Sequence, residues 1–593
     1  DPEPARLQAP LDLVQEGTRQ GLVGDREAVP GHQGSDQEPG QHAQRGGGEQ
    51  GIGALLHPGE DRVDPGPAAL QPAPAVGQVL QRELAPAARA PELFAGLLLL
   101  DPVIILSIFA GVSAGLFVGA MPGLTATMAL AVLLPFTFTL PPLHGLVALG
   151  AVYMGAIYGG SFAAILVNTP GTPSSIATAF EGYPMSKQGR ALEALGLATV
   201  SSAIGGIAGA LFLLLLSPPL ARLSLRFGPS EYFWVAILGL TLIASLSEGS
   251  TMKGMMGGAL GMVIGTIGVA PIGGETRFTF GMPVLQGGVA MIVALIGLFV
   301  LPELYSIAAK GKTALTAVEV DSKARSSLWQ VTKKVFSMPG NLIRSCIIGE
   351  IVAIIPGAGG NIANLVAYNE AKRASKHPEK FGTGVPEGLV ATESSNNVTV
   401  AGSMVPLLTL GIPGAPPDAV ILGVMLLHGL RPGIELFTTS GQLTYGFIIS
   451  MGFAAVAMVP VGLLGGRLIY KVIFRTPYYF LVPTIAMATI LGTYAVRNSH
   501  TDVLIMLILG TMGHLFKQVG VAPAPIVLGL ILGKIAEMGY VQTILTGQAY
   551  QYPFLKLFES GLSHILIGMI LVSAAWPYLS ALKRRIKSRS KKV

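Results

Sequence analysis

Long apolar segments recur along this chain, and they constrain its fold more than any other feature. A helix of about 18 or more apolar residues can cross the ~30 Å hydrocarbon core of a bilayer. Hydrophobic residues make up 51% of the chain and charged residues only 12%, which is about half the charged share of a soluble domain. The sequence therefore predicts an all-α polytopic membrane protein. Clear examples of such segments are Val103–Met121, Ala194–Leu216, Val284–Leu301, Leu443–Leu464 and Ile565–Leu582.

The apolar segments fall into two groups, one on each side of a polar stretch. About twelve transmembrane helices are expected in all. Lys and Arg gather in the polar stretch and at the end of the chain, and such an excess marks the cytoplasmic side of a membrane protein. The C-terminus is therefore expected in the cytoplasm. The predicted parts are a first membrane half (93–307), a polar cytoplasmic connection (308–340), a second membrane half (341–582) and a basic cytoplasmic tail (583–593).

Residues 1–92 differ from the rest of the chain. They are rich in Gly, Pro, Gln, Arg and Glu and contain no Lys, Tyr, Phe, Trp or Met. Such a stretch cannot bury enough apolar surface to offset the entropy lost on ordering. Two interpretations stay open, a disordered extension and a mis-annotated start that translates upstream sequence, and we favour the second. Neither gives this segment a function.

Composition and missing motifs exclude several classes of function. Cys346 is the only cysteine, which excludes disulfides within the chain and cysteine-based metal clusters. The net charge of +6 comes from basic connections between apolar segments, so we expect the lipid bilayer and not a nucleic acid as the partner of the basic residues. The sequence has no phosphate-binding Gly-x-x-x-x-Gly-Lys-Ser/Thr motif and no His-Glu-x-x-His or Gly-x-Ser-x-Gly motif. We expect neither an enzyme, nor a cofactor, nor a bound metal other than Na⁺.

Each predicted half contains two Pro-Gly pairs, in the same order. Proline removes a helical hydrogen-bond donor, and glycine permits the backbone to leave and re-enter a helix. Open backbone at membrane depth is tolerated only inside protein or against a water-filled cavity. Matched breaks in two related halves therefore predict broken helices or re-entrant elements around a solute site, although turns at the membrane surface are the alternative. The predicted helix-break residues are Pro122, Gly123, Pro170, Pro356, Gly357 and Pro413.

Polar residues gather beside these breaks. Half-helix N-termini present free N–H groups, which suit carboxylates, and exposed carbonyl and side-chain oxygens suit Na⁺. The pattern predicts that a small organic anion binds here. The predicted substrate-binding residues are Thr125, Ser161, Asn168, Thr169, Gly171, Asn361, Asn396, Asn397 and Gly414.

The densest polar cluster, Ala391–Thr399, contains an ionisable residue beside an apolar segment. Such a residue is costly in a membrane and is a functional hypothesis by default. We expect Glu393, with Ser394 and Asn364, on the side of the coupling cation, which is Na⁺ or H⁺. The alternative is that Glu393 lies in an interfacial loop and is hydrated.

These motifs resemble those of the large membrane subunit of the tripartite tricarboxylate transporters, the TctA family. The resemblance runs from about residue 95 to about residue 580 and rests on Gly119–Thr125, Tyr158–Ser161, Asn168–Gly171, Ile355–Asn361 and Glu387–Gly414. It implies a multi-pass protein of the bacterial inner membrane that takes up tricarboxylates or related carboxylates by symport with Na⁺ or H⁺. It also implies two partners, a small four-helix membrane subunit and a periplasmic solute-binding protein.

Three other functions stay open. A channel, or a permease for another small organic anion or solute, would also have broken helices. An intramembrane enzyme lacks support from any motif. A scaffold subunit predicts that the polar clusters can be mutated without effect.

Overall fold

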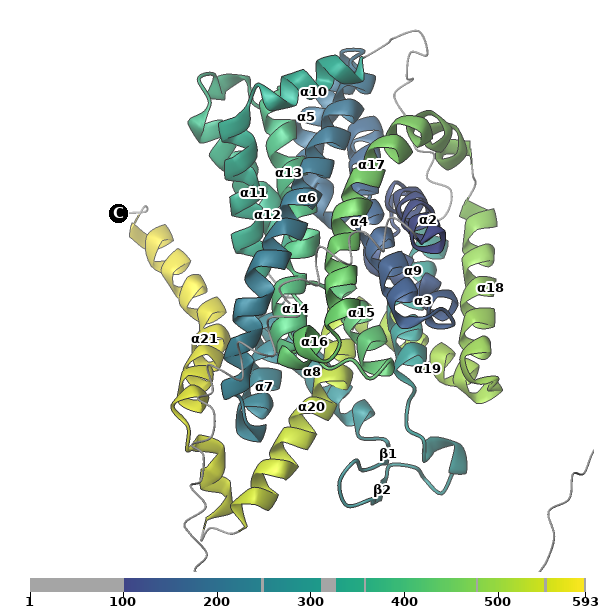
Figure 1. Ribbon diagram of the computed structural model, residues 1–593, viewed down its shortest axis with the longest axis vertical. Helices are drawn as coiled ribbons and strands as arrows, with labels where there is room; N and C mark the ends of the chain where they lie inside the picture. The colour runs from purple at the N-terminus through teal and green to yellow at the C-terminus, as the bar shows by residue number, and fades with distance from the viewer. Residues whose placement is uncertain are drawn as a thin grey trace, which may run out of the picture. The chain divides into compact units, whose positions relative to one another are not determined.

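The computed structural model describes residues 101–246, 250–310, 327–356, 359–475, 478–548 and 552–590 (Figure 1). All of them belong to one compact unit, Ala73–Val593. Predictions for residues 1–92, for Gly357 and for the middle of the polar connection lie outside the described residues, as does the end of the basic tail.

Before residue 311 the described chain is helical apart from one short hairpin. Its two strands pair antiparallel, with Gly268 opposite Arg277 and Val269 opposite Thr276. The elements are α2 (Pro102–Gly119), α3 (Ala126–Phe138), α4 (Pro142–Val167), η1 (Pro173–Ser175), α5 (Ile176–Lys187), α6 (Ala191–Leu223), η2 (Ser224–Arg226), α7 (Pro229–Leu246), α8 (Thr251–Gly265), β1 (Gly268–Val269), β2 (Thr276–Arg277), η3 (Pro283–Leu285) and α9 (Met291–Lys310).

After residue 326 the described elements are all helical. They are α10 (Leu328–Phe336), α11 (Pro339–Ile354), α12 (Gly359–Ala374), η4 (Pro378–Lys380), α13 (Pro386–Gly402), α14 (Met404–Leu410), α15 (Pro416–Leu427), α16 (Ile434–Thr438), α17 (Gly441–Arg475), α18 (Tyr478–Arg497), α19 (His500–Gln518), α20 (Pro523–Gly547), η5 (Pro553–Phe558) and α21 (Gly561–Ser590).

The helices confirm a multi-pass membrane protein. Among the described residues, seven helices are long and apolar enough to cross a membrane, and the bent pair α10 and α11, at 77°, would make an eighth. Helices α3, α15 and the first part of α21 are apolar but shorter. The predicted twelve spans in two halves are not reached by this count and stay a prediction.

Local sequence explains where the first helices begin and end. The carboxylate of Asp101 caps α2 by accepting a hydrogen bond from the Val103 N–H at 2.8 Å, and Pro102 occupies the first helical position, where a missing N–H costs nothing. Thr125 caps α3 in the same way. Helix α4 ends at Asn168, whose φ of 55° turns the chain sharply, since Asn tolerates the left-handed region better than most residues.

One predicted apolar segment begins several residues before the helix that it predicts. Val284 lies in η3, and the helix that the segment Val284–Leu301 predicted begins only at Met291. Gly287 and Gly288 separate the two, and Gly288 has a φ of 68°, which a helix cannot accommodate. Apolar composition alone did not reveal this break.

The two Pro-Gly regions with their flanking helices pack in matching ways. Helix α2 packs on α4, and α11 packs on α13. A Cβ on Gly115 would overlap the Val152 carbonyl oxygen, and one on Gly349 would lie 2.8 Å from the Ser395 carbonyl oxygen. Gly115 and Gly349 each precede the first proline of their region by seven residues. The same close approach of backbones therefore occurs at corresponding positions.

In each region the second Pro-Gly pair packs against the helix end that precedes the first Pro-Gly pair. A Cβ on Gly171 would overlap the Gly119 carbonyl oxygen, and one on Gly414 would lie 3.2 Å from the Ala353 carbonyl oxygen. Gly119 and Ala353 each precede the first proline by three residues. In both regions the two breaks therefore meet.

This packing predicts that Gly171→Ala destabilises the protein. The added methyl group has no room beside Gly119 and Gly160, and overpacking of this kind costs about 1–3 kcal/mol. Thermal unfolding in detergent, followed by fluorescence-detected size exclusion, measures the effect. Gly340→Ala is the control, because a Cβ there meets no heavy atom within 4 Å. Equal melting temperatures for the two variants would contradict the packing argument.

Candidate functional site

The polar segment Ala391–Thr399 lies in α13, which is enclosed on all sides. Every residue from Gly388 to Gly402 is buried, because α6, α11 and α12 all pack against this helix. Figure 1 shows α11, α12 and α13 side by side next to α5 and α6. The alternative that placed Glu393 in a hydrated interfacial loop is therefore wrong.

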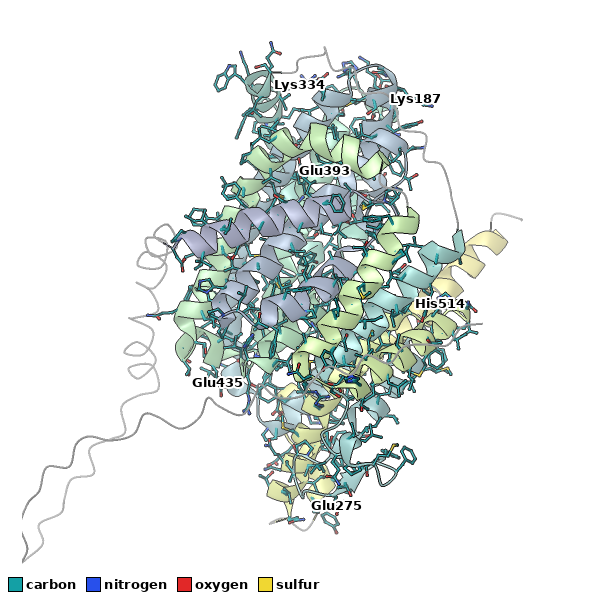
Figure 2. The ribbon with its side chains drawn as sticks, turned by 90° about the vertical axis from the view of Figure 1, so that its right-hand side faces the viewer. Lys187, Glu275, Lys334, Glu393, Glu435 and His514 are labelled. Carbon is teal, nitrogen blue, oxygen red and sulfur yellow. The ribbon has the colours of Figure 1, made fainter. Side chains whose placement is uncertain are left out.

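Two hydroxyl groups from outside α13 hold the Glu393 carboxylate. Ser202 of α6 donates a hydrogen bond to Oε2 at 2.7 Å, and Thr178 of α5 donates one to Oε1. No salt bridge among the described residues includes Glu393, which is fully buried (Figure 2). The donors come from before residue 311 and the carboxylate from after residue 326, so this contact joins the two predicted halves.

Asn396 and Asn397 are fully buried without hydrogen-bonding partners. Neither the oxygen nor the nitrogen of either side-chain amide bonds to another protein atom. Buried polar groups are nearly always paired, and an unpaired one costs about 1–3 kcal/mol. Two adjacent residues with four such atoms are therefore hard to explain by stability. They are available to a polar ligand.

Asn396 faces a helix N-terminus and the loop of the other Pro-Gly region. A Cβ built on Gly360, the second residue of α12, would lie 3.6 Å from Asn396 Oδ1 and 3.1 Å from Thr399 Oγ1. The same atom would lie 3.0 Å from the Cβ of Ser174, which belongs to η1. Asn364 of α12 donates a hydrogen bond to the Ser174 carbonyl at 2.5 Å, and its Oδ1 is unpaired. We call Ser174, Gly360, Asn364, Asn396 and Thr399 the asparagine cluster.

The asparagine cluster has the chemistry of an anion site. The first N–H groups of α12 have no helical partner and carry the positive end of the helix dipole. Gly360 adds no side chain, so a ligand can approach these N–H groups closely. Side-chain amides offer both donors and acceptors. This combination can bind a carboxylate through its oxygens.

Several predicted binding residues have local structural partners. Thr125 Oγ1 accepts a hydrogen bond from Met128 N at 3.1 Å and so caps α3. Ser161 donates to the Tyr158 carbonyl at 2.7 Å, and Thr169 donates to the Val167 carbonyl at 3.3 Å. Ser394 donates to the Val390 carbonyl at 2.8 Å. None of these hydrogen bonds reaches the asparagine cluster.

The remaining predicted binding residues differ in position. Asn168 is exposed at the end of α4. Gly171 packs on Gly119, and Gly414 packs on Ser403 and Ala353. Asn361 lies in the first turn of α12, but its side chain is outside the described part of the structure. The structure thus brings Asn364 and Asn396 together with Ser174 and Thr399, which the sequence did not single out.

Glu181 is a buried carboxylate that the sequence analysis missed. It accepts hydrogen bonds from the Tyr368 hydroxyl at 2.8 Å and from the N–H groups of Gly382, Gly384 and Val385 at 2.6, 2.8 and 2.7 Å. These donors lie in α12 and in the loop before α13. Glu181 therefore fixes the two helices that form the asparagine cluster. In the sequence, the signal that could have identified Glu181 was an ionisable residue in a largely apolar helix.

Asp418 has a comparable structural role in the first turn of α15. Its Oδ2 accepts a hydrogen bond from the Ala415 N–H at 2.7 Å, and its Oδ1 accepts one from Ser403 at 3.1 Å. Both oxygens are thus paired, in contrast to the amides of Asn396 and Asn397.

The fold and the asparagine cluster define a class: a multi-pass helical membrane protein with polar groups inside, at matched helix breaks, as membrane transport proteins have. Residues 105–528 match the Tripartite tricarboxylate transporter TctA family, and the chain belongs to this family. It is therefore a subunit of a tripartite tricarboxylate transporter. The family resemblance predicted from the motifs is confirmed, and the family is one of transporter subunits and not of enzymes.

Two relatives from Agrobacterium vitis are similar to this chain. One is described as an uncharacterized 52.8 kDa protein in the TAR-I ttuC' 3' region and is 37% identical over 438 residues, which is 74% of this chain and 86% of the relative. The other, an uncharacterized protein in the TAR-II ttuC' 3' region, is 36% identical over 189 residues, 32% of this chain and 78% of the relative. No solved structure matches this chain.

Proposed function

We propose that this protein is the permease subunit that carries a tricarboxylate or a related carboxylate across the bacterial inner membrane. Transport is secondary and is driven by a gradient of Na⁺ or H⁺. The observation that carries the proposal is the asparagine cluster. It places the unpaired amide of Asn396 beside the N-terminus of α12, next to the equally unpaired Asn397 in sequence, within a fold whose family transports tricarboxylates.

The substrate's carboxylate groups bind at the N-terminus of α12 and at the amides of Asn396 and Asn397. N–H groups of the helix and of the side chains donate to the carboxylate oxygens. Glu393 lies on the cation side, with Ser394 and the free Oδ1 of Asn364 as further candidate oxygens. The substrate and the cation thus bind to neighbouring turns of α13.

The membrane part consists of two structurally related halves, each with a pair of broken elements. The matching contacts at Gly115 and Gly349 and at Gly171 and Gly414 support this proposal. Helices also cross between the halves: α6 packs on α13, and α17 packs on α4. A site between two related halves can be opened to one side or the other by rocking one against its counterpart.

Basic residues support an orientation with the C-terminus in the cytoplasm. Figure 2 shows Lys187 and Lys334 at one end of the described unit and Glu275 at the other. Lys334 of α10 is held by a hydrogen bond of 2.6 Å to Glu193 of α6. The positive-inside rule places this end in the cytoplasm. The opposite end, with β1 and β2, then faces the periplasm. There a solute-binding protein delivers the substrate to the membrane complex, which this chain forms with a small four-helix membrane subunit.

Reconstituted transport tests the proposal. All three subunits are placed in liposomes, and uptake of labelled carboxylates is measured with a Na⁺ or pH gradient, and with or without the binding protein. We expect saturable accumulation that requires both a gradient and the binding protein. A channel would equilibrate the solute without accumulation and without the binding protein. That result would replace the proposal by the alternative of a channel for small organic anions.

A further inference from the structure

A further buried carboxylate, Glu350 of α11, has no role in the site described above. Its side chain is 3% exposed. Neither carboxylate oxygen makes a hydrogen bond, and none of the salt bridges in the described ranges includes it. This contrasts with Glu181 and Glu393, whose oxygens all have donors. An ionised carboxylate in such surroundings is strongly disfavoured, and the neutral acid is favoured.

Glu350 lies between two breaks in the helices. It is four residues before the end of α11, which leads into the Pro356 break. Its Oε2 would be 2.6 Å from a Cβ built on Gly402, the last residue of α13. Helix α14 follows directly, with Pro406 in its first turn. A movement at either break changes what surrounds this carboxyl group.

The carbonyl group of Gly402 lacks its usual helical donor. In a regular helix the N–H four residues further on would donate to it, but that residue is Pro406, which has no N–H. A protonated carboxyl group can donate a hydrogen bond to a carbonyl, whereas an ionised one only accepts. The carboxyl group of Glu350 therefore packs against a residue whose carbonyl has lost its helical donor.

The corresponding position in the first Pro-Gly region has an apolar residue. Leu116 precedes Pro122 by six residues, as Glu350 precedes Pro356. Gly159 precedes Pro170 by eleven residues, as Gly402 precedes Pro413. A Cβ on Gly159 would lie 2.6 Å from the Leu116 carbonyl oxygen. The backbone of Leu116 thus faces the glycine in the first region, whereas the carboxyl group of Glu350 faces it in the second.

The carboxylates of the surrounding helices are occupied elsewhere. Of the elements packed on α11, α13 contributes Glu393, bound by Thr178 and Ser202, and Glu387, which accepts from Ser375. Cys346 lies one turn earlier on α11 and is also buried. The carboxylates of α6 and α12 are in ion pairs: Glu193 with Arg190 and Lys334, and Glu370 with Arg373. The other charged groups of these helices and of α10 are Arg222, Lys333 and Lys372.

We infer that Glu350 is the binding site of the coupling proton. The inference rests on the proposed function, takes H⁺ as the coupling ion, and places it at Glu350 of α11 in place of Glu393. A proton joins an ionised Glu350 when the carboxyl group is open to one side of the membrane, forming an O–H bond. The neutral acid is then enclosed against Gly402, and the proton leaves to water on the other side. A metal ion would need several oxygen ligands, whereas a proton needs only the carboxyl group of Glu350, which packs against Gly402.

Solute-driven proton movement in liposomes with all three subunits tests this inference. A pH-sensitive dye reports protons while a labelled carboxylate reports uptake. In Glu350→Gln, which stays neutral at every pH, we expect proton movement and accumulation against a gradient to fall about tenfold or more, while exchange of solute for solute continues. Glu350→Leu places at this position the residue type of Leu116, and we expect the same result as for Glu350→Gln. Glu370→Gln, a change at a half-buried residue paired with Arg373 on α12, is the control and should transport as the unmodified protein does.

A variant-free measurement accompanies it. Dicyclohexylcarbodiimide, an apolar reagent, modifies protonated carboxyl groups, and mass spectrometry of the unmodified transporter should find it on Glu350. Proton coupling that survives Glu350→Gln, or Glu350 left unlabelled while other buried acids react, would overturn the inference. Transport by the unmodified protein with Na⁺ and no proton movement would also overturn it, yet would leave the proposed function intact. Absence of any carboxylate transport would instead refute the proposed function.

Discussion

Replacing both Asn396 and Asn397 by leucine is expected to abolish carboxylate uptake while the protein stays folded. Each lost hydrogen bond to a charged ligand costs about 1.5–3 kcal/mol, which corresponds to a loss of affinity of about ten- to a hundredfold per residue. Both amides are fully buried without a protein partner, and leucine has the same number of side-chain heavy atoms with the same branching. The melting temperature of the double variant should therefore equal or exceed that of the unmodified protein, because unpaired polar groups have been removed.

Uptake of labelled carboxylate and thermal unfolding are measured on the same preparations. Asn369→Leu is the matched control, because Asn369 is an exposed asparagine on α12. The control should keep its uptake. A double variant that unfolds well below the unmodified protein would mean that the asparagines serve the fold. A stable double variant with normal uptake would show that the substrate binds elsewhere.

The second large effect is expected at Glu181, and it concerns stability. In Glu181→Ala the Tyr368 hydroxyl and the N–H groups of Gly382, Gly384 and Val385 all lose their acceptor. A buried donor left unpaired costs about 1–3 kcal/mol. With four donors affected, we expect the loop before α13 to detach from α5, and the protein to be degraded or to melt many degrees earlier. Fluorescence-detected size exclusion after heating measures this.

Glu370→Ala is the control for Glu181→Ala. Glu370 forms an ion pair of 2.7 Å with Arg373 within α12, and Arg373 is largely exposed. Such surface pairs contribute about 0–1 kcal/mol, so the melting temperature should hardly change. Glu181→Gln separates charge from shape, because the amide keeps one acceptor oxygen and should be destabilised less. Normal stability of Glu181→Ala would contradict the proposed role of this carboxylate.

The membrane fold and the position of the breaks could be predicted because the relevant signals are local. The length of an apolar segment, such as Val103–Met121, decides whether it can span a bilayer, and α2 occupies nearly that range. Pro122 blocks the continuation of α2 through its own covalent structure, and Gly411, two residues before Pro413, ends α14 in the left-handed conformation. The pairing of Glu393 with Thr178 and Ser202, in contrast, depends on residues that are about two hundred positions away in the chain.

The candidate site was predicted only in part for the same reason. Asn364 and Asn396 were expected to be functional from their type and surroundings, but Ser174 joins them through tertiary packing. Thr125 also has a polar side-chain oxygen beside a Pro-Gly pair, yet this oxygen caps the helix that begins after it. Composition cannot distinguish an oxygen that closes a local hydrogen bond from one that stays free. That distinction needs the positions of neighbouring helices.

The enclosure of α13 has a consequence for how the protein is made. This helix, with Glu393 and a run of Ser, Asn and Thr, is not among the helices of the described residues that are apolar enough to span a membrane. Ionisable residues at the centre of a segment oppose its release from the translocon into lipid. Helix α6, which is synthesised earlier, packs along α13 and supplies the Ser202 hydroxyl. Insertion of α13 is therefore a cooperative event, in which a helix already in the bilayer receives a later one that lipid alone would reject.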